Sequence, residues 1–509
     1  EPNVMFTLDD SGSMLFNYLP DTEINFQLYA IHPGEPAQVG TYEVKGALPS
    51  GYYALAARRR SPDVNLLYYD PRVLYLPWMK ADGTREPKAS PEAAYYFYGH
   101  STVTVNLRGT YQLRPNDHKV CVGAARGWND PCKQGYGINA VKPATYFLFK
   151  DRERLTREGI TPQEREQLLN DVRNYTRVSI SEATSFQIDS DERTDCMKAA
   201  NGVRTCTQEQ EYQNFANWFQ YHRTRMHVAI AAVGNAFATA LGKDIRVGYG
   251  RINKSAESVV DGAPTSIVER GVRRFEGEDR SAFFTWLSQR TAKGGTPLMH
   301  SLQTVNRYFE RKDYTGPWAK TPGKQTGEEH LACRRSYHIL MTDGQYTFYD
   351  DSPSHYTNES DNTSGEEIVD HRPGSSQGKV HSTYQYQPVR PFMSATRGTL
   401  ADYAMDAWKR DLRPDLDNLV TPYDGNPSFW QSVSTCTLGF GVEGNIPYPD
   451  GLKGIMDGTR EWPSRVEAES PSAVDDLWHA AINGHGKYVN VRNSSGFLTE
   501  MAGILADIS

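Results

Sequence analysis

The chain has 509 residues, which is enough for about three domains at ~150 residues each. Its 55 Lys and Arg against 62 Asp and Glu leave a net charge of −7, so the chain as a whole has no basic field that would attract nucleic acid or an anionic membrane. No stretch approaches the ~20 consecutive apolar residues that span a bilayer, so we expect neither a nucleic-acid partner nor a transmembrane segment.

Short apolar runs without polar alternation predict buried parallel strands at four places in the chain. The first run, residues 4–8, leads directly into an Asp-Asp-Ser-Gly-Ser loop. The other three runs cover residues 245–249, 337–341 and 436–440, and Gly or Asp follows each of them closely.

Helical patterns lie between these strands. Apolar residues recur three and four positions apart from Phe215 to Phe237, which predicts an amphipathic helix. Further helices are expected after Phe283, after Pro297 and over residues 473–481. Strands that alternate with helices predict an α/β fold with a doubly wound, mainly parallel sheet flanked by helices. In such sheets, ligands bind at the carboxyl ends of the strands.

Residues 16–210 interrupt this alternation of strands and helices. The segment is rich in proline, and residues 101–107 alternate polar and apolar side chains as a half-exposed strand does. We therefore expect a large β-rich insertion at 16–210, and a discontinuous sheet domain made of residues 1–15 and 211–509. Within that domain, residues 349–397 begin with several acidic residues and are expected to form a surface loop.

Four of the six cysteines form two pairs that are close in sequence. Cys121 and Cys132 flank turn-forming residues, and Cys196 and Cys206 flank the Asn-Gly dipeptide at 201–202, so each pair can close a small loop as a disulfide. Because disulfides persist in oxidising compartments, this pattern predicts a location outside the cytoplasm.

The last two cysteines, Cys333 and Cys436, precede or lie in strands that we expect to be neighbours in the sheet. They form either a third disulfide or two free thiols, because an unpaired cysteine also packs well as a small apolar residue.

Three polar segments are placed to meet at one edge of the sheet. An Asp-x-Ser-x-Ser motif follows the first strand, Gly-Gly-Thr-Pro precedes a helix, and Thr-Asp-Gly follows a later strand. Hydroxyl and carboxylate oxygens suit a hard divalent cation, which we expect to be Mg²⁺, with Ca²⁺ or Mn²⁺ as alternatives, and they suit zinc or copper poorly. The expected metal ligands are Asp9, Ser11, Ser13, Thr296 and Asp343.

Taken together, these segments resemble the metal-ion-dependent adhesion site of von Willebrand factor A domains, and all five ligand positions are matched. The sequence departs from that family in the insertion after Ser13, which displaces the first helix to about Tyr212. The alternative interpretation is that the polar residues only cap helices and hold no metal.

Longer segments resemble the amino-terminal region of PilY-type proteins, which are tip-associated adhesins and assembly factors of bacterial type IV pili. The similarity runs from Asn3 to about Asn493, and it is carried by residues 63–71, 214–218, 399–405, 411–416 and 476–484. It implies passage through the periplasm to the pilus tip or cell surface, and contacts there with minor pilins and with host or abiotic surfaces. It also implies a β-propeller after the present chain, if the chain is a fragment.

The resulting hypothesis is a non-enzymatic module that binds a divalent cation, and through it a carboxylate of a partner, in pilus assembly, adhesion and surface sensing. The alternative is a scaffold that docks onto minor pilins, with a structural or vestigial metal site. No catalytic residue is expected. The G-x-S-x-G pattern at 374–378 has neither a buried strand before Ser376 nor a helix after it, and a nucleophile elbow needs both.

Overall fold

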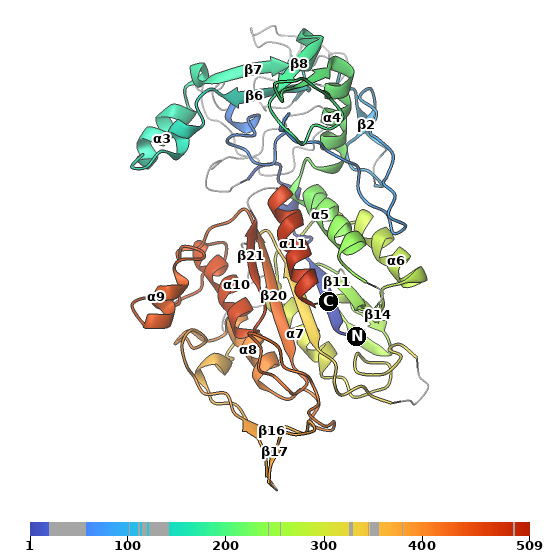
Figure 1. The fold of residues 1–509 in the computed structure, drawn as a ribbon, viewed down its shortest axis with the longest axis vertical. Helices are drawn as coiled ribbons and strands as arrows, with labels where there is room; N and C mark the ends of the chain where they lie inside the picture. Colours follow the sequence, from blue (N-terminus) through green and yellow to red (C-terminus); the bar gives the residue numbers. More distant parts are fainter. Residues whose placement is uncertain are drawn as a thin grey trace. The chain divides into compact units, whose positions relative to one another are not determined.

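The computed structural model (Figure 1) describes residues 1–19, 57–100, 102–109, 112–113, 120–121, 142–242, 244–254, 256–324, 329–344, 346, 356–378, 380–491 and 494–508. The chain divides into two compact units. Unit 1 consists of Glu1–Met14, Ala236–Trp286 and Arg290–Ser509, and unit 2 of Leu15–Asn235 and Leu287–Gln289. The domain boundaries expected from the sequence stay a prediction, because a compact unit need not fold independently.

Unit 1 contains a six-stranded sheet with the strand order β14-β11-β1-β15-β20-β21. Its strands are β1 (Asn3–Leu8), β11 (Arg246–Arg251), β14 (Val268–Arg274), β15 (Ser336–Met341), β20 (Val433–Phe440) and β21 (Tyr488–Val491). All neighbouring strands are parallel except β14, which is antiparallel to β11 at one edge. The chain winds outward from β1 first to one side and then to the other, so the predicted doubly wound, mainly parallel sheet is confirmed.

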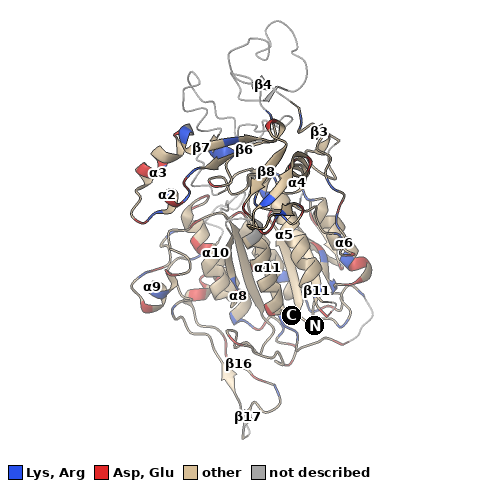
Figure 2. Cartoon of the chain, turned by 45° about the horizontal axis from the view of Figure 1, so that its top comes forward, with Lys and Arg blue, Asp and Glu red and all other residues tan. Residues whose placement is uncertain are grey.

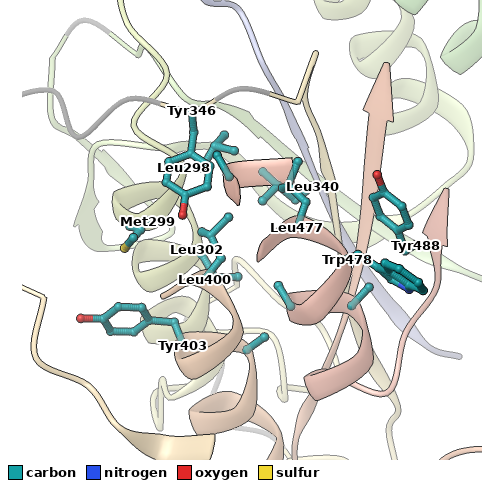
Figure 3. Close-up of a cluster of buried hydrophobic side chains, with 14 of the residues drawn as sticks. Leu298, Met299, Leu302, Leu340, Tyr346, Leu400, Tyr403, Leu477, Trp478 and Tyr488 are labelled. Atoms are coloured by element: carbon teal, nitrogen blue, oxygen red, sulfur yellow. The ribbon is translucent and has the colours of Figure 1, made fainter. Parts of the chain in front are cut away.

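One face of this sheet is covered by the helices α7 (Leu298–Phe309), α8 (Leu400–Lys409) and α10 (Pro471–Asn483). Leu298 and Leu302 of α7 pack with Leu340 of β15, Leu400 of α8 and Leu477 of α10 in one buried cluster (Figure 3). The strands β1, β15 and β20 are buried along their whole length, which explains why they are apolar without alternation.

The opposite face packs against the end of α5 (Arg225–Thr239), from Ala236 on, and against α6 (Gly277–Ser288) and α11 (Ser494–Ile508). The ring of Phe6 in β1 lies 5.5 Å from that of Phe237 in the last turns of α5 and 6.3 Å from that of Phe283 in α6. Phe440 of β20 contacts Phe497 of α11 with ring centres 5.5 Å apart. Helices therefore cover both faces of the sheet.

The remaining elements of unit 1 lie outside the main sheet and the helices that cover it. They are β12 (Ser258–Val260), β13 (Ala263–Thr265), β16 (Ile368–Val369), β17 (Ser376–Gln377), β18 (Val380–His381), β19 (Thr383–Tyr384) and α9 (Leu452–Asp457). Ser376 lies in a two-residue strand, and within the described residues no helix follows it before α8. This is not the geometry of a nucleophile elbow.

Unit 2 contains short antiparallel strands together with helices, and the expected β-rich insertion at 16–210 stays a prediction. Its strands are β2 (Ala94–Tyr95), β3 (Thr104–Val105), β4 (Gln112–Leu113), β5 (Val120–Cys121), β6 (Thr145–Phe149), β7 (Tyr175–Ser179), β8 (Ser185–Ile188), β9 (Met197–Lys198) and β10 (Arg204–Thr207), and its further helices are α2 (Glu153–Thr156), α3 (Pro162–Leu169) and α4 (Gln208–Tyr221). Among all the described helices, none is both long enough and apolar enough to cross a membrane.

The helical pattern from Phe215 to Phe237 forms two helices, α4 and α5, instead of one. The hydroxyl of Thr224 accepts a hydrogen bond from the backbone N–H of His227 at 3.3 Å and bonds the His227 ring nitrogen Nδ1 at 2.7 Å. Thr224 thus caps the start of α5. Apolar spacing continues through the break, so the pattern alone does not reveal the cap.

The predicted disulfide between Cys196 and Cys206 is confirmed, and it joins β10 to the turn before β9. Gly202, in the predicted Asn-Gly turn, has φ +87°, a conformation that glycine adopts without strain. The predicted pair Cys121–Cys132 lies outside the residues whose side chains the structure describes.

The disulfide considered for Cys333 and Cys436 is absent, because both described thiols are free. Cys436 pairs in register with Ile339, the fourth residue of β15, whereas Cys333 lies before that strand begins at Ser336. The strand from Ser336 to Ile339 rises about 10 Å. That is more than the Cα separation a disulfide spans.

A buried ion pair joins three segments of unit 2. Arg193 and Glu211 are both fully buried and form a salt bridge. Arg193 Nη1 also donates to the carbonyl oxygen of Pro71 at 2.7 Å, and the hydroxyl of Tyr69 donates to Glu211 Oε2 at 3.1 Å. The pair therefore ties α4 to residues 69–71 and to the segment that carries the disulfide.

We expect Glu211→Ala to lower the free energy of unfolding by ~3–5 kcal/mol, because it leaves the buried Arg193 with only the partly exposed Asp195 as counter-charge and removes the acceptor of the Tyr69 hydroxyl. Urea unfolding followed by circular dichroism measures this. Glu209 is the matched control, since it lies on the same helix but is exposed and pairs with Arg108 at the surface. Glu209→Ala should cost less than ~1 kcal/mol. Equal losses for the two variants would contradict this account.

Three buried carboxylates connect the segment before α8 to α8 and α10. Asp402 Oδ1 accepts from the backbone N–H of Asp361 at 3.2 Å, and Asp476 Oδ2 accepts from that of Leu400 at 2.9 Å. The side chain of Asn483 donates to Asp361 Oδ2 at 3.3 Å. Burial, with the neighbouring Asp402 charge adding to it, raises the pKa of Asp361 to about 8. Burial also raises the pKa of Asp402 and that of Asp476 to about 6.

The raised pKa of Asp361 predicts a loss of stability as pH rises from 5 to 8. An aspartate in the unfolded chain titrates near ~3.9, so between that value and the folded pKa the folded protein binds the extra proton. The contribution is fully present below the unfolded pKa and is lost as pH rises through the folded one. The urea concentration at the unfolding midpoint should decrease from pH 5 to pH 8 in the wild type, and it should decrease less in Asp361→Asn. The exposed residue Asp424 gives a control, Asp424→Asn, which should keep the wild-type difference. An undiminished difference in Asp361→Asn would refute the assignment.

Candidate metal centre

The two predicted acidic ligands follow neighbouring strands. Asp9 is the first residue after β1, and Asp343 is the second after β15. These strands are paired in parallel, with Leu8 opposite Met341, so both loops leave the same edge of the sheet. The β1–β15 pair is also where the strand order switches sides, which is the usual position of ligand sites in doubly wound sheets.

The carboxylate of Asp9 is held by both of these loops. Its Oδ1 accepts from the backbone N–H of Ser11 at 2.8 Å, and its Oδ2 accepts from the hydroxyl of Thr342 at 2.7 Å. The backbone N–H of Asp343 also points to Oδ2, at 3.4 Å. Asp9 is fully buried, so these donors replace water around the charge.

Two predicted hydroxyl ligands lie next to each other. Ser11 Oγ and Ser13 Oγ are 3.0 Å apart and share a hydrogen bond. Ser13 belongs to the short 3-10 helix η1 (Gly12–Leu15), which turns the chain back so that alternate side chains meet. Ser11 is buried and Ser13 is partly exposed, so this pair reaches from the interior toward solvent.

The Gly-Gly-Thr-Pro segment is bonded to the same loop. The backbone N–H of Gly12 donates to the carbonyl oxygen of Gly294 at 3.0 Å, and the N–H of Lys293 donates to that of Asp10 at 2.8 Å. Thr296 follows immediately and is buried. The structure therefore brings together the three loops that carry the five predicted ligands, while the assignment of these residues as metal ligands stays a prediction.

Asp10 and Asn253 support the site, and the motif did not reveal them. Asp10 Oδ1 accepts from the backbone N–H of Asn253 at 2.8 Å, and the side-chain amide of Asn253 donates to the carbonyl oxygen of Gly295 at 2.7 Å. Arg251 Nη1 donates to Asp10 Oδ2 at 3.3 Å. The only indication of this role in the sequence was the Asp-Asp dipeptide at residues 9–10. Its second carboxylate, that of Asp10, bonds the loop after β11.

The electrostatics of the site favour a nearby positive charge. Burial raises the pKa of Asp9, and the charge of Asp10 adds to this, although hydrogen bonds from Ser11 and Thr342 oppose it. Burial also raises the pKa of Asp10. A divalent cation beside these groups would stabilise their ionised forms.

The donor set fits a hard cation. All five predicted ligands offer oxygen, and none is His or Cys. Over the described part of the chain, no group of three or more His, Cys, Asp or Glu side chains is placed to hold a metal. A site with two carboxylates and three hydroxyls suits Mg²⁺, Ca²⁺ or Mn²⁺ and does not suit zinc.

Proteins named type IV pilus biogenesis factor PilY1, from Pseudomonas aeruginosa, are similar to this chain along its whole length. The protein of strain PAK is 27% identical over 541 residues, and that of strain UCBPP-PA14 is 25% identical over 537 residues. The alignments include 100% of this chain and 38% of each relative, so the chain spans well under half of their length. No protein-family model matches the chain.

Two solved structures were also found to be similar. A crystal structure of the pilus adhesin SpaC from Lactobacillus rhamnosus GG is 14% identical, with a TM-score of 0.25, over 56% of this chain and 28% of that one. A von Willebrand factor type A structure from Catenulispora acidiphila is 14% identical, with a TM-score of 0.23, over 57% of this chain and 39% of that one.

The glycine of Thr-Asp-Gly is required by the shape of the loop. Gly344 has φ +103°, and a Cβ there would lie 2.0 Å from Val442 Cγ2. We expect Gly344→Ala to lower the free energy of unfolding by about 2–4 kcal/mol, from backbone strain and overpacking together. Gly503, in α11, has open space around it and is the matched control. Thermal unfolding of both variants measures this, and Gly503→Ala should be neutral or stabilising. Similar effects of the two substitutions would rule out the steric explanation.

Proposed function

We propose that this chain, a homologue of part of PilY1, is a non-enzymatic, cation-binding module that acts in type IV pilus assembly and adhesion outside the cell. The observation that carries the proposal is the joining of the three oxygen-bearing loops around Asp9, at the switch point of the sheet. The names of the relatives support the pilus role. The disulfide supports an oxidising location at the pilus tip or cell surface.

In this proposal Asp9, Ser11, Ser13, Thr296 and Asp343 hold Mg²⁺, or Ca²⁺ or Mn²⁺ in its place. The bound cation supplies a Lewis-acidic position for a carboxylate of the ligand. Asp9 orients the two loops through its hydrogen bonds, and Ser13, the partly exposed member, faces the side from which a ligand approaches. The ligand is a host or abiotic surface group, and minor pilins are the partners in assembly.

A second candidate function is a scaffold that docks onto minor pilins, with a structural or vestigial metal site. One observation favours it. Ser11 and Thr342 already bond both oxygens of Asp9, so hydrogen bonds alone can hold the two loops together. In that case unit 2 makes the contacts with pilins, and loss of the cation leaves them unchanged.

Calorimetric titration with Mg²⁺ and Mn²⁺ tests the ligand assignment. Ser13→Ala removes one oxygen from a partly exposed position, and Asp343→Asn removes one charge. Each should weaken cation binding at least about tenfold, because each takes one donor from a small set. Asp424→Asn removes an exposed carboxylate elsewhere and should leave binding unchanged. Unchanged affinity in both site variants would show that the cation does not bind there.

An experiment with the full-length protein, in bacteria that make pili, distinguishes the two candidate functions. If the cation recruits a ligand, Asp343→Asn should reduce adhesion while the number of surface pili, counted by electron microscopy, stays normal. If unit 2 is a scaffold, the same variant should change neither quantity, and substitutions in unit 2 should reduce pilus number.

A further inference from the structure

A cavity of about 1060 Å³ opens in unit 1 at the edge of the sheet opposite the candidate metal centre. Its lining includes Pro2 before β1, Arg246 at the start of β11, Arg274 at the end of the antiparallel β14, and Arg334 and Arg335 before β15. These positions are all at the amino ends of the parallel strands. The cavity is therefore separate from Asp9 and Asp343, which follow the carboxyl ends.

The lining of this cavity is strongly basic. Eight of its residues are Lys or Arg and only two are acidic, although the whole chain carries a net charge of −7. Both acidic groups are already paired. Glu1 forms salt bridges with Arg246 and Arg274, and Asp279 forms one with Arg270. Figure 2 colours Lys and Arg blue and marks the two ends of the chain. Glu1 and Ile508, which are at or next to these ends, belong to the lining of the cavity.

Arg334 and Arg246 are the two buried cations of this lining, and Arg334 is the more deeply buried one. The residue Arg334 is 3% exposed, and its Nη1 donates to the carbonyl oxygens of Ala319 at 2.8 Å and Pro317 at 3.2 Å. Its Nε and Nη2 have no hydrogen-bond partner among the described residues, and none of the described acidic side chains forms an ion pair with it. A buried guanidinium with two unpartnered donors is costly, because neither water nor protein compensates them.

The two unpartnered nitrogens, Nε and Nη2, are the pair through which an arginine can bind an oxyanion at two points. Nε and Nη2 lie along one edge of the guanidinium and point in the same direction, so they bind two oxygens of one group at once. This chain uses the same edge elsewhere. Arg193 places Nε and Nη2 on the two oxygens of Asp195, both at 3.0 Å, and Arg413 places them on those of Asp415 at 2.9 and 2.7 Å.

The neighbours of Arg334 hold it in place and keep the cavity positive. Arg246 donates to the carbonyl oxygens of Ala319 and Lys320 at 3.1 and 2.7 Å, so the same segment anchors both guanidiniums. Arg335 Nε donates to the carbonyl oxygen of Thr421 at 3.0 Å. Burial, followed by the Arg246 charge, lowers the pKa of Arg334 to about 9. A bound anion would reverse that effect.

The geometry points to an oxyanion site in this cavity, in which Arg334 turns its Nε–Nη2 edge, covered by protein in the structure, toward the cavity and binds two oxygens of a phosphate or carboxylate group. Arg246 and Arg335 contribute positive charge beside it. The volume of the cavity leaves room for a ligand larger than the anion itself. The site needs no metal, and it does not depend on the proposed role in the pilus.

Calorimetric titrations with sodium phosphate and with sodium acetate, in buffer freed of metal by a chelating resin and at constant ionic strength, test this site. Removing the metal in this way excludes any contribution of a cation at the metal centre and adds no competing carboxylate. Tighter binding of phosphate would identify a phosphate ligand, and tighter binding of acetate a carboxylate ligand. If neither anion binds, the proposal is wrong.

The variant Arg334→Lys keeps the charge but cannot make the two-point contact, so we expect anion affinity to fall at least about tenfold. The matched control is Arg372→Lys, because the fork of Arg372 is already filled by Asp370. That control should bind like the wild type. Unchanged affinity in Arg334→Lys would overturn the proposal.

A second variant covers the case in which Arg334→Lys does not fold, which circular dichroism would reveal. Lys324 is an exposed residue of the cavity lining, so Lys324→Glu introduces a negative charge without disturbing the core. Anion affinity should fall about threefold or more by like-charge repulsion, and the effect should shrink in high salt. Unchanged affinity in Lys324→Glu would place the bound anion elsewhere.

Discussion

The parallel pairing of β1 with β15 is the constraint on which the candidate metal centre depends. It joins Asn3 to Ser336, positions more than three hundred residues apart, and in doing so brings the loops after both strands to one edge. The hydrogen bond from Thr342 to Asp9 then closes the site across that pair. Nearly all of unit 2, Leu15–Asn235, lies between β1 and β11 in the sequence, so β1 can pair with the other strands of the sheet only across this long segment. Such non-local pairing slows folding, because loop closure costs entropy before any contact forms.

Much of the sheet and the positions of the candidate ligands could be predicted from the sequence. Strands buried on both faces show as unbroken apolar runs, and Asp, Ser and Gly directly after them show where the loops are. Three other features could not be predicted, because local patterns do not report tertiary register. The cap at Thr224 lies inside a continuous apolar spacing, the free thiol of Cys436 follows from its pairing with Ile339, and Asp10 acquires its role only when Asn253 is beside it.

The two ends of the sheet carry charges of opposite sign, although acidic and basic residues are interspersed along the sequence. The carboxyl ends of the strands collect Asp9, Asp10 and Asp343, whereas the amino ends collect Arg246, Arg334 and other basic side chains. The basic cluster combines Arg246, three arginines of β14 and the adjacent pair Arg334 and Arg335, and these three segments are far apart in the chain. A net charge of −7 therefore conceals two regions of opposite sign.

The antiparallel strand β14 also limits how this sheet can associate with other chains. An edge strand offers unpaired N–H and C=O groups that a strand from another molecule can extend. Along β14 the register with β11 shifts twice, and the strand carries Arg270, Arg273 and Arg274. Bulges and positive charges both disfavour pairing with a further strand. Self-association by strand addition is therefore disfavoured at this edge. This protection matters during folding, because β1 can pair with β15 only after more than three hundred intervening residues have been brought together.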